Sequence, residues 1–117
     1  MTTKRVQPVP TQYSKIVIHG GTAYLAGLIA EDWDKDIKGQ TTEIFAQIDS
    51  LLKSAGTDKS SLLSMTVYIK SFDDYAAFKE TYAEWIDHDQ LPARATVRAD
   101  LLDPKLKIEI QATAAIG

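Results

Sequence analysis

The sequence contains no cysteine in its 117 residues. Disulfide bridges, thiolate catalysis and cysteine-based zinc sites are therefore excluded, and the chain suits a reducing compartment such as the cytoplasm. It also lacks a basic excess, because 13 lysines and arginines stand against 16 acidic residues and give a net charge of −3. Binding to nucleic-acid phosphates normally depends on clustered lysine and arginine, so small molecules or other proteins are the expected partners.

Long hydrophobic runs are missing as well. The longest apolar stretch, residues 23–30, is about eight residues long and contains Gly27, whereas a membrane-spanning helix needs about 20. The first eight residues carry two basic side chains with no apolar segment behind them, so no secretory signal is expected. Neither a linker nor a repeat divides the chain. We therefore expect a single domain over residues 1–117 that does not act in a membrane.

Hydrophobic periodicity predicts an α+β domain with the element order ββαβαββ. The first two β-type runs flank Gly20-Gly21, a dipeptide that tolerates the positive φ angles of a tight antiparallel hairpin. A helix with one apolar stripe should end at Gly56, and Ser71 should begin a second helix. The predicted strands are residues 15–19, 22–29, 62–70, 93–99 and 106–116.

The two amphipathic helices predict a mixed sheet that is covered on one face only. Alternation along residues 62–70 places Leu63, Met65, Val67 and Ile69 on the covered face. The open face mixes apolar and polar side chains, which is typical of a surface that contacts another subunit. Its predicted members are Tyr24, Ala26, Leu28, Thr66, Tyr68, Arg94, Thr96 and Glu109.

A specific motif lies near the C-terminus. The run Pro92-Ala93-Arg94-Ala95-Thr96-Val97, followed by Ile108-Glu109-Ile110, resembles the motif of the RidA/YjgF family, in which a Pro-Ala-Arg turn enters one strand and an apolar-Glu-apolar triplet lies on the last. Gln12-Tyr13-Ser14 is similar to a Pro-Tyr-Ser segment of the same family. The resemblance extends from Tyr13 to the end of the chain.

The resemblance implies a trimeric barrel of the chorismate-mutase-like fold, with the helices facing outward. Members of the family bind small carboxylates in clefts between subunits. The active members hydrolyse reactive 2-imino or enamine acids to 2-keto acids and ammonia. They use no cofactor, and the imines come largely from pyridoxal-phosphate enzymes upstream.

The resemblance also assigns roles to residues. Arg94 would clamp the substrate carboxylate, because a guanidinium keeps its charge and presents two parallel N–H donors. Glu109 would assist the attacking water, Tyr13 would close the cleft from a neighbouring subunit, and Ala95 and Thr96 would contact the ligand. Arg94 and Glu109 are expected on facing positions of adjacent strands, so a structural ion pair is the alternative interpretation.

Three residues depart from the family pattern. Ala26 stands where active members often have Ser, Leu28 replaces a common Gln, and Asp100 replaces a small or basic residue. The chain is thus similar to the divergent YoaB-like branch. The alternative function is a non-catalytic module of the same fold that binds or senses a 2-keto acid. Cleavage of RNA, which is sometimes attached to the family, fits poorly with the negative net charge.

The remaining polar residues predict structural roles. His19 and His88 lack partners at metal-ligand spacing, so no metal site is expected. Asp32, Asp34 and Asp36 resemble the start of a calcium loop, but no glycine and no closing glutamate follow at the required positions. We expect this run to be a solvated loop.

Overall fold

One mixed sheet carries most of the chain. The computed structural model describes residues 2–117. Its strands are β1 (Lys4–Val9), β2 (Tyr13–His19), β3 (Thr22–Leu25), β4 (Leu62–Ile69), β5 (Ala93–Arg98) and β6 (Ile108–Ala115). The helices are α1 (Ile37–Ser54) and α2 (Tyr75–Trp85), and two short 3-10 turns are η1 (Lys59–Ser61) and η2 (Phe72–Asp74).

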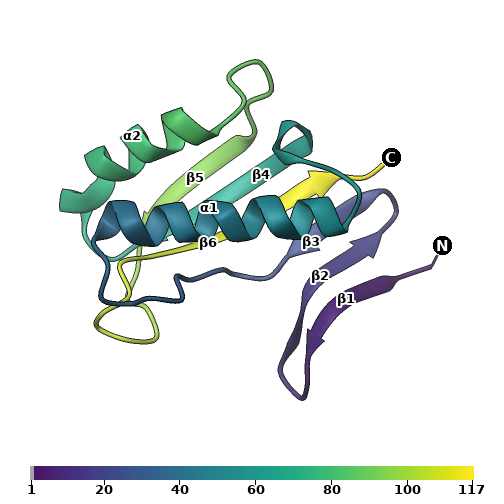
Figure 1. Cartoon of the computed structure of the whole chain (residues 1–117), viewed down its shortest axis with the longest axis horizontal. Coiled ribbons are helices and arrows are strands. Elements are labelled where there is room, and N and C mark those ends of the chain that lie inside the picture. The colour runs from purple at the N-terminus through teal and green to yellow at the C-terminus, as the bar shows by residue number, and fades with distance from the viewer. Residues whose placement is uncertain (1) are drawn as a thin grey trace.

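The strand order across the sheet is β1-β2-β3-β6-β4-β5. The β4–β5 pair is parallel and the other pairs are antiparallel. Both helices lie over the same face of the sheet, as Figure 1 shows. The predicted α+β class, with a mixed sheet and one helical layer, is confirmed. Neither helix in residues 2–117 has the length and apolar character needed to cross a bilayer.

The edge strand β1 is absent from the predicted order ββαβαββ. It pairs with β2 through Val6 and Ile16 and through Pro8 and Ser14. Four of its six residues are exposed, so it lacks the alternation that marks a half-buried strand. Gln7 has a φ of 50° and Pro8 has no N–H, and both features weaken the local β signal.

Local signals explain the other boundaries. Gly20 and Gly21 have φ angles of 62° and 81°, which confirms the predicted hairpin. Helix α1 begins at Asp36, whose side chain accepts a hydrogen bond of 2.8 Å from the Gly39 N–H. The predicted solvated loop therefore also supplies a helix cap. The second helix starts later than expected, because Ser71 caps the 3-10 turn η2 and α2 follows it.

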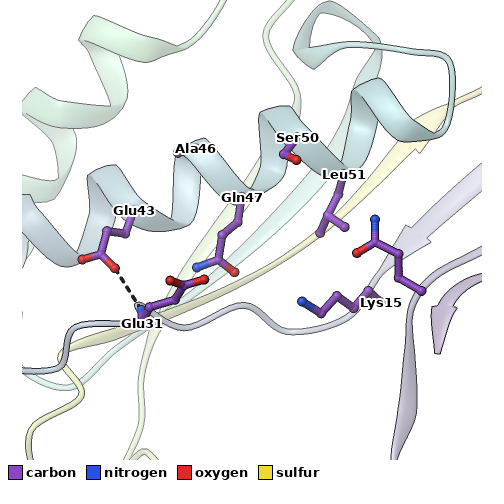
Figure 2. A pocket seen from close by; sticks show the side chains of 8 residues that line it. Lys15, Glu31, Glu43, Ala46, Gln47, Ser50 and Leu51 are labelled. Carbon is purple, nitrogen blue, oxygen red and sulfur yellow. Dashed lines mark hydrogen bonds between the residues drawn. The ribbon is translucent and has the colours of Figure 1, made fainter. Parts of the chain in front are cut away.

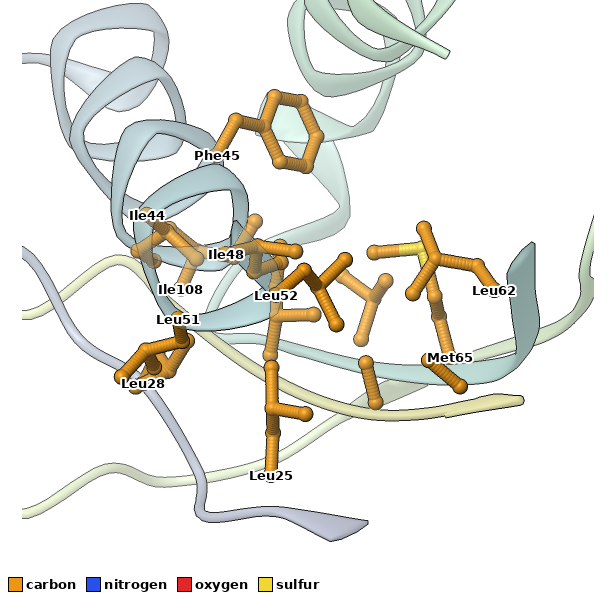
Figure 3. Packing of buried hydrophobic residues seen from close by; sticks show 14 of the residues in the cluster. Leu25, Leu28, Ile44, Phe45, Ile48, Leu51, Leu52, Leu62, Met65 and Ile108 are labelled. Atoms are coloured by element: carbon orange, nitrogen blue, oxygen red, sulfur yellow. The ribbon is translucent and has the colours of Figure 1, made fainter. Parts of the chain in front are cut away.

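The core lies between the helices and the covered face of the sheet. Figure 3 shows side chains of α1, including Ile48 and Leu52, directed toward the strands. Four predicted placements are wrong. Arg94 and Thr96 were expected on the open face, but their register partners on β4 are the buried Met65 and Val67, so both lie on the covered face. The other two are Leu63 and Leu28. A β-bulge at the start of β4 leaves Leu63 48% exposed and buries Leu62 instead. Leu28 is 6% exposed and belongs to the core, because the chain leaves regular strand geometry after Leu25.

A buried amide fastens α1 to two loops. Gln40 is fully buried, and its Nε2 donates to the carbonyl oxygens of Trp33 (3.2 Å), Lys35 (3.0 Å) and Lys105 (3.0 Å). Its Oε1 accepts a hydrogen bond of 2.9 Å from the Lys107 N–H. One side chain thus satisfies backbone groups of the two segments that precede α1 and β6.

Candidate functional site

Arg94 lies on β5 at the edge of the sheet and projects toward the helices. Its register partner on β4 is Met65, which is buried beneath them. The Arg94 Nη2 donates a hydrogen bond of 3.0 Å to the Tyr75 Oη. Its Cζ lies 5.4 Å from the centre of the Phe78 ring and 4.7 Å from that of Tyr82. Two aromatic rings and the hydroxyl of a third residue therefore fix the guanidinium.

The aromatic side chains of α2 that hold Arg94 carry no charge. Burial raises the pKa of the Tyr82 hydroxyl, and the charge of Arg94 opposes that shift only in part. A neutral phenol cannot neutralise the arginine. Within residues 2–117, every ion pair involves a lysine, so the Arg94 guanidinium has no carboxylate partner. Its charge is available to an external acid.

A hollow of about 340 Å³ opens beside Arg94 and is lined by Phe72, Tyr75, Arg94 and Thr96. The Thr96 Oγ1 is buried and has no hydrogen-bond partner in the described part of the chain. A buried hydroxyl without a partner is costly, and a ligand oxygen would satisfy it. The hollow therefore combines a fixed cation, an unused hydroxyl and two aromatic walls, a set suited to a small organic acid.

Glu109 lies on the opposite face of the sheet. Glu109 is on the open face of β6, where its register partner is Tyr68 on β4. It lines a second hollow of about 440 Å³ together with Gly27, Tyr68 and Asp100. The carboxylate lies directly over Gly27, where an added Cβ would collide with the Glu109 Oε2. A larger residue at position 27 would require the Glu109 side chain to move.

The predicted pairing of Arg94 with Glu109 is wrong. Strand β4 lies between β5 and β6, and the two side chains project from opposite faces. A structural ion pair between them within one chain is excluded for the same reason. The expectation failed because consecutive strands were assumed to be neighbours.

Tyr13 and Ala95 are not brought to Arg94 either. Tyr13 begins β2 and is 51% exposed, and three strands separate β2 from β5. Ala95 is exposed and alternates with Arg94, so its methyl group faces the open side of the sheet. Thr96 alone among the predicted residues lines the hollow together with Arg94.

Two residues of the hollow were not predicted to belong to a site. Tyr75 opens the row of aromatic side chains on α2, and its hydroxyl is the hydrogen-bond partner of Arg94. Phe72 is 58% exposed beside the entrance. Aromatic residues at helical spacing give the same pattern whether they fill a core or support an arginine, so the sequence held no signal for this role.

Another hollow, of about 360 Å³, lies between α1 and the connector 26–36 (Figure 2). Two of its polar side chains, Glu43 and Gln47, hold the connector. The Glu43 Oε1 accepts hydrogen bonds from the N–H groups of Glu31 (3.0 Å) and Asp32 (3.2 Å), and these bonds help to lower the Glu43 pKa. Gln47 donates to a backbone carbonyl of the same connector. These contacts give the hollow a structural role in holding the connector against α1.

The histidines have structural contacts. The His19 Nδ1 lies 2.9 Å from the Thr3 Oγ1, and the His88 Nε2 lies 2.7 Å from the Ala83 carbonyl oxygen. Across residues 2–117, no three histidine or acidic side chains gather as metal ligands would.

The chain is similar in sequence to a known family of proteins. The family model described as Endoribonuclease L-PSP matches residues 3–116. A RutC family protein of Haemophilus ducreyi is 38% identical over 109 residues, which is 93% of this chain and 93% of that protein. The RutC family protein YoaB of Escherichia coli K12 is 37% identical over 116 residues, which is 99% of this chain and 100% of that protein.

Solved structures agree with these sequence matches. NMB1025, a member of the YjgF protein family from Neisseria meningitidis, superimposes with a TM-score of 0.95 at 32% identity and covers 100% of this chain and 97% of its own. A putative translation initiation inhibitor from Salmonella typhimurium gives a TM-score of 0.90 at 32% identity, with 98% of each chain covered. The chain therefore belongs to the endoribonuclease L-PSP family, which is also known as the RidA/YjgF family and includes the RutC proteins.

Proposed function

We propose that this protein hydrolyses reactive 2-imino or enamine acids to 2-keto acids and ammonia, with the substrate carboxylate held by Arg94 at a subunit interface. The observation that carries the proposal is the unpaired guanidinium of Arg94, fixed by Tyr75 and the α2 rings at the wall of a hollow. Membership of the RidA/YjgF family supports the reaction class. The activity suits the cytoplasm, where amino-acid metabolism generates such imines.

The proposed chemistry needs only water. A carboxylate gripped bidentately by Arg94 has one orientation, and the buried Thr96 hydroxyl accepts or donates the next hydrogen bond. Water adds to the C=N carbon, the C–N bond breaks, and ammonia leaves together with the 2-keto acid. Glu109 takes a proton from the water and returns one to the nitrogen. No electron transfer occurs, so no cofactor is required.

Arg94 and Glu109 act together only if the site is shared between copies. Within one protomer they lie on opposite faces of the sheet, so one ligand touches both only where two protomers meet. Tyr13, distant from Arg94 in its own chain, would likewise come from a neighbour. We expect a homotrimer in which the hollow of Arg94 faces that of Glu109, with Tyr24 and Tyr68 on the buried open face.

A coupled assay tests the proposal. An amino-acid oxidase generates imino acids in solution, and the protein is expected to accelerate release of the ketoacid. Arg94→Ala should lower kcat/KM by about 100-fold or more, because two charge-assisted hydrogen bonds are lost. Arg94→Lys keeps the charge without the planar fork and should recover only part of the rate. Equal rates for native protein and Arg94→Ala, or no acceleration by native protein, would contradict the proposal.

Gly27→Ala tests the position of Glu109 separately from its chemistry. The new methyl group would displace the Glu109 carboxylate, which ends a flexible side chain, so the folded state should lose little stability. We expect the deaminase rate to fall about tenfold, because a shift of about 1 Å at a reacting group is costly. The thermal midpoint and the ketoacid release rate are measured together.

Gly56→Ala is the matched control. Gly56 has a φ of 79° and no heavy atom within 4 Å of an added Cβ. This substitution should cost about 1 kcal/mol of stability through backbone strain and leave the rate unchanged. A Gly27→Ala protein with native activity would remove Glu109 from the mechanism.

The second candidate is a binding or sensing module for a 2-keto acid. Ala26, in place of a serine that active relatives often carry, favours it. Leu28 does not, because its side chain is in the core and cannot contact a ligand. Calorimetric binding of a ketoacid that is lost in Arg94→Ala, without any deaminase activity, would identify this alternative.

A further inference from the structure

Strand β5 carries a second arginine on the same side as Arg94. The register partners of Arg94 and Arg98 on β4 are Met65 and Ile69, and both partners are buried beneath the helices. Because side chains alternate along a strand, Arg94, Thr96 and Arg98 share one face. Four residues of strand span about 13 Å between the outer Cα atoms, before the long side chains lean toward each other. The two guanidiniums can therefore approach one small ligand from its two ends.

Neither arginine is neutralised by the chain. The three ion pairs of residues 2–117 all involve lysine, and no carboxylate lies at ion-pair distance from Arg94 or Arg98. Arg98 lines a separate hollow with Lys70 and Asp100. The Lys70 Nζ in that hollow donates to the Pro104 carbonyl oxygen at 2.9 Å.

Phe72 and Thr96 connect the two arginines into one site. The Arg98 Cζ lies 5.5 Å from the centre of the Phe72 ring, and the same ring lines the hollow of Arg94. The unpartnered Thr96 Oγ1 is midway between them along the strand. The sequence of groups along β5 is thus a cation, a free hydroxyl and a second cation, with an aromatic wall beside them.

We propose that the natural ligand of this site is a short dicarboxylic acid, in which Arg94 holds the 2-imino or 2-keto carboxylate and Arg98 holds the distal one. The hydrolysis of such an imine rests on the proposed function, whereas the binding of the diacid does not. Two charged ends match two unpaired guanidiniums, and the Thr96 hydroxyl, which lines the hollow beside Arg94, can bond the C=N or C=O group next to the first carboxylate. Dehydrogenation or oxidation of an acidic α-amino acid is the class of reaction that supplies such an imine.

The test compares a substrate that carries a second acid group with one whose side chain is apolar. Imino acids generated from glutamate and from leucine are supplied at equal concentration, and the native protein is expected to prefer the diacid by tenfold or more in kcat/KM. Arg98→Gln shortens the side chain and removes its charge, and it should reduce this preference at least tenfold. Arg5→Gln makes the same change of net charge on the opposite edge strand β1 and should leave the preference intact.

Binding separates this inference from the proposed hydrolysis. Calorimetry with 2-oxoglutarate and 2-oxobutanoate on native protein, Arg98→Gln and Arg5→Gln needs no turnover. Tighter binding of the diacid that disappears only in Arg98→Gln supports the dicarboxylate site even if no imine is hydrolysed. Equal binding of the two acids by native protein, or equal losses in both variants, overturns the inference even if hydrolysis is observed.

Discussion

Co-folding Arg94→Ala with Glu109→Gln is expected to restore about a quarter of the native deaminase rate, although each variant alone is nearly inactive. The two residues lie on opposite faces of one protomer, so each proposed pocket takes Arg94 from one copy and Glu109 from the next. When the variants mix at random, about one junction in four joins an intact Arg94 to an intact Glu109. Ketoacid release per protomer, measured on the co-expressed pair, checks this result.

The control is Arg94→Ala mixed with the double variant Arg94→Ala, Glu109→Gln, which forms oligomers without an intact pair and should stay inactive. The solution mass of each mixture should be near three times the 12.9 kDa of one chain. A co-folded pair no faster than its parents would show that the two residues do not meet across an interface. Native activity in Glu109→Gln alone would limit Glu109 to a structural role.

Gln40→Leu is expected to lower the free energy of unfolding by about 3 kcal/mol. The substitution fills a similar volume but leaves three carbonyl oxygens and one N–H without the amide that binds them. A buried polar group that loses its partner costs about 1–3 kcal/mol, and water can reach some of the freed groups. Urea unfolding at a fixed protein concentration measures the loss, since association also contributes to stability.

Gln47→Leu provides a matched control on the same helix. Gln47 makes one hydrogen bond, of 2.8 Å, to the Ile29 carbonyl oxygen. The same substitution there should cost about 1 kcal/mol. Equal losses at Gln40 and Gln47 would mean that the four hydrogen bonds of Gln40 contribute no more stability than the single hydrogen bond of Gln47.

Most of the fold was predictable because its signals are local. Gly20-Gly21 marks the hairpin, Gly56 ends α1, and apolar periodicity marks both helices. Strand β1 escaped prediction because it is mostly exposed and contains Pro8. The bulge that turns Leu63 outward also leaves no trace in the sequence, since an extra residue looks like ordinary alternation.

The candidate site was predictable only in its parts. The motif around Arg94 singled out Arg94 and Thr96 as candidates, and the two residues line the same hollow. The face to which each side chain points depends on strand order, and β4 separates β5 from β6 although β6 follows β5 in the chain. Tyr75 and Arg98 were missed because their role depends on which ring and which hollow the fold places beside them.

The two outer edges of the sheet resist the addition of another strand by different means. Gln7, with its positive φ, and Pro8, which has no N–H, interrupt the row of hydrogen-bonding groups that β1 presents. Such interruptions protect a protein against fibrous aggregation. The chain has no proline within β5, where repulsion between arginines would discourage a second β5 from pairing. Growth into open-ended assemblies is thus hindered at both margins, and closed association through the face of the sheet stays possible.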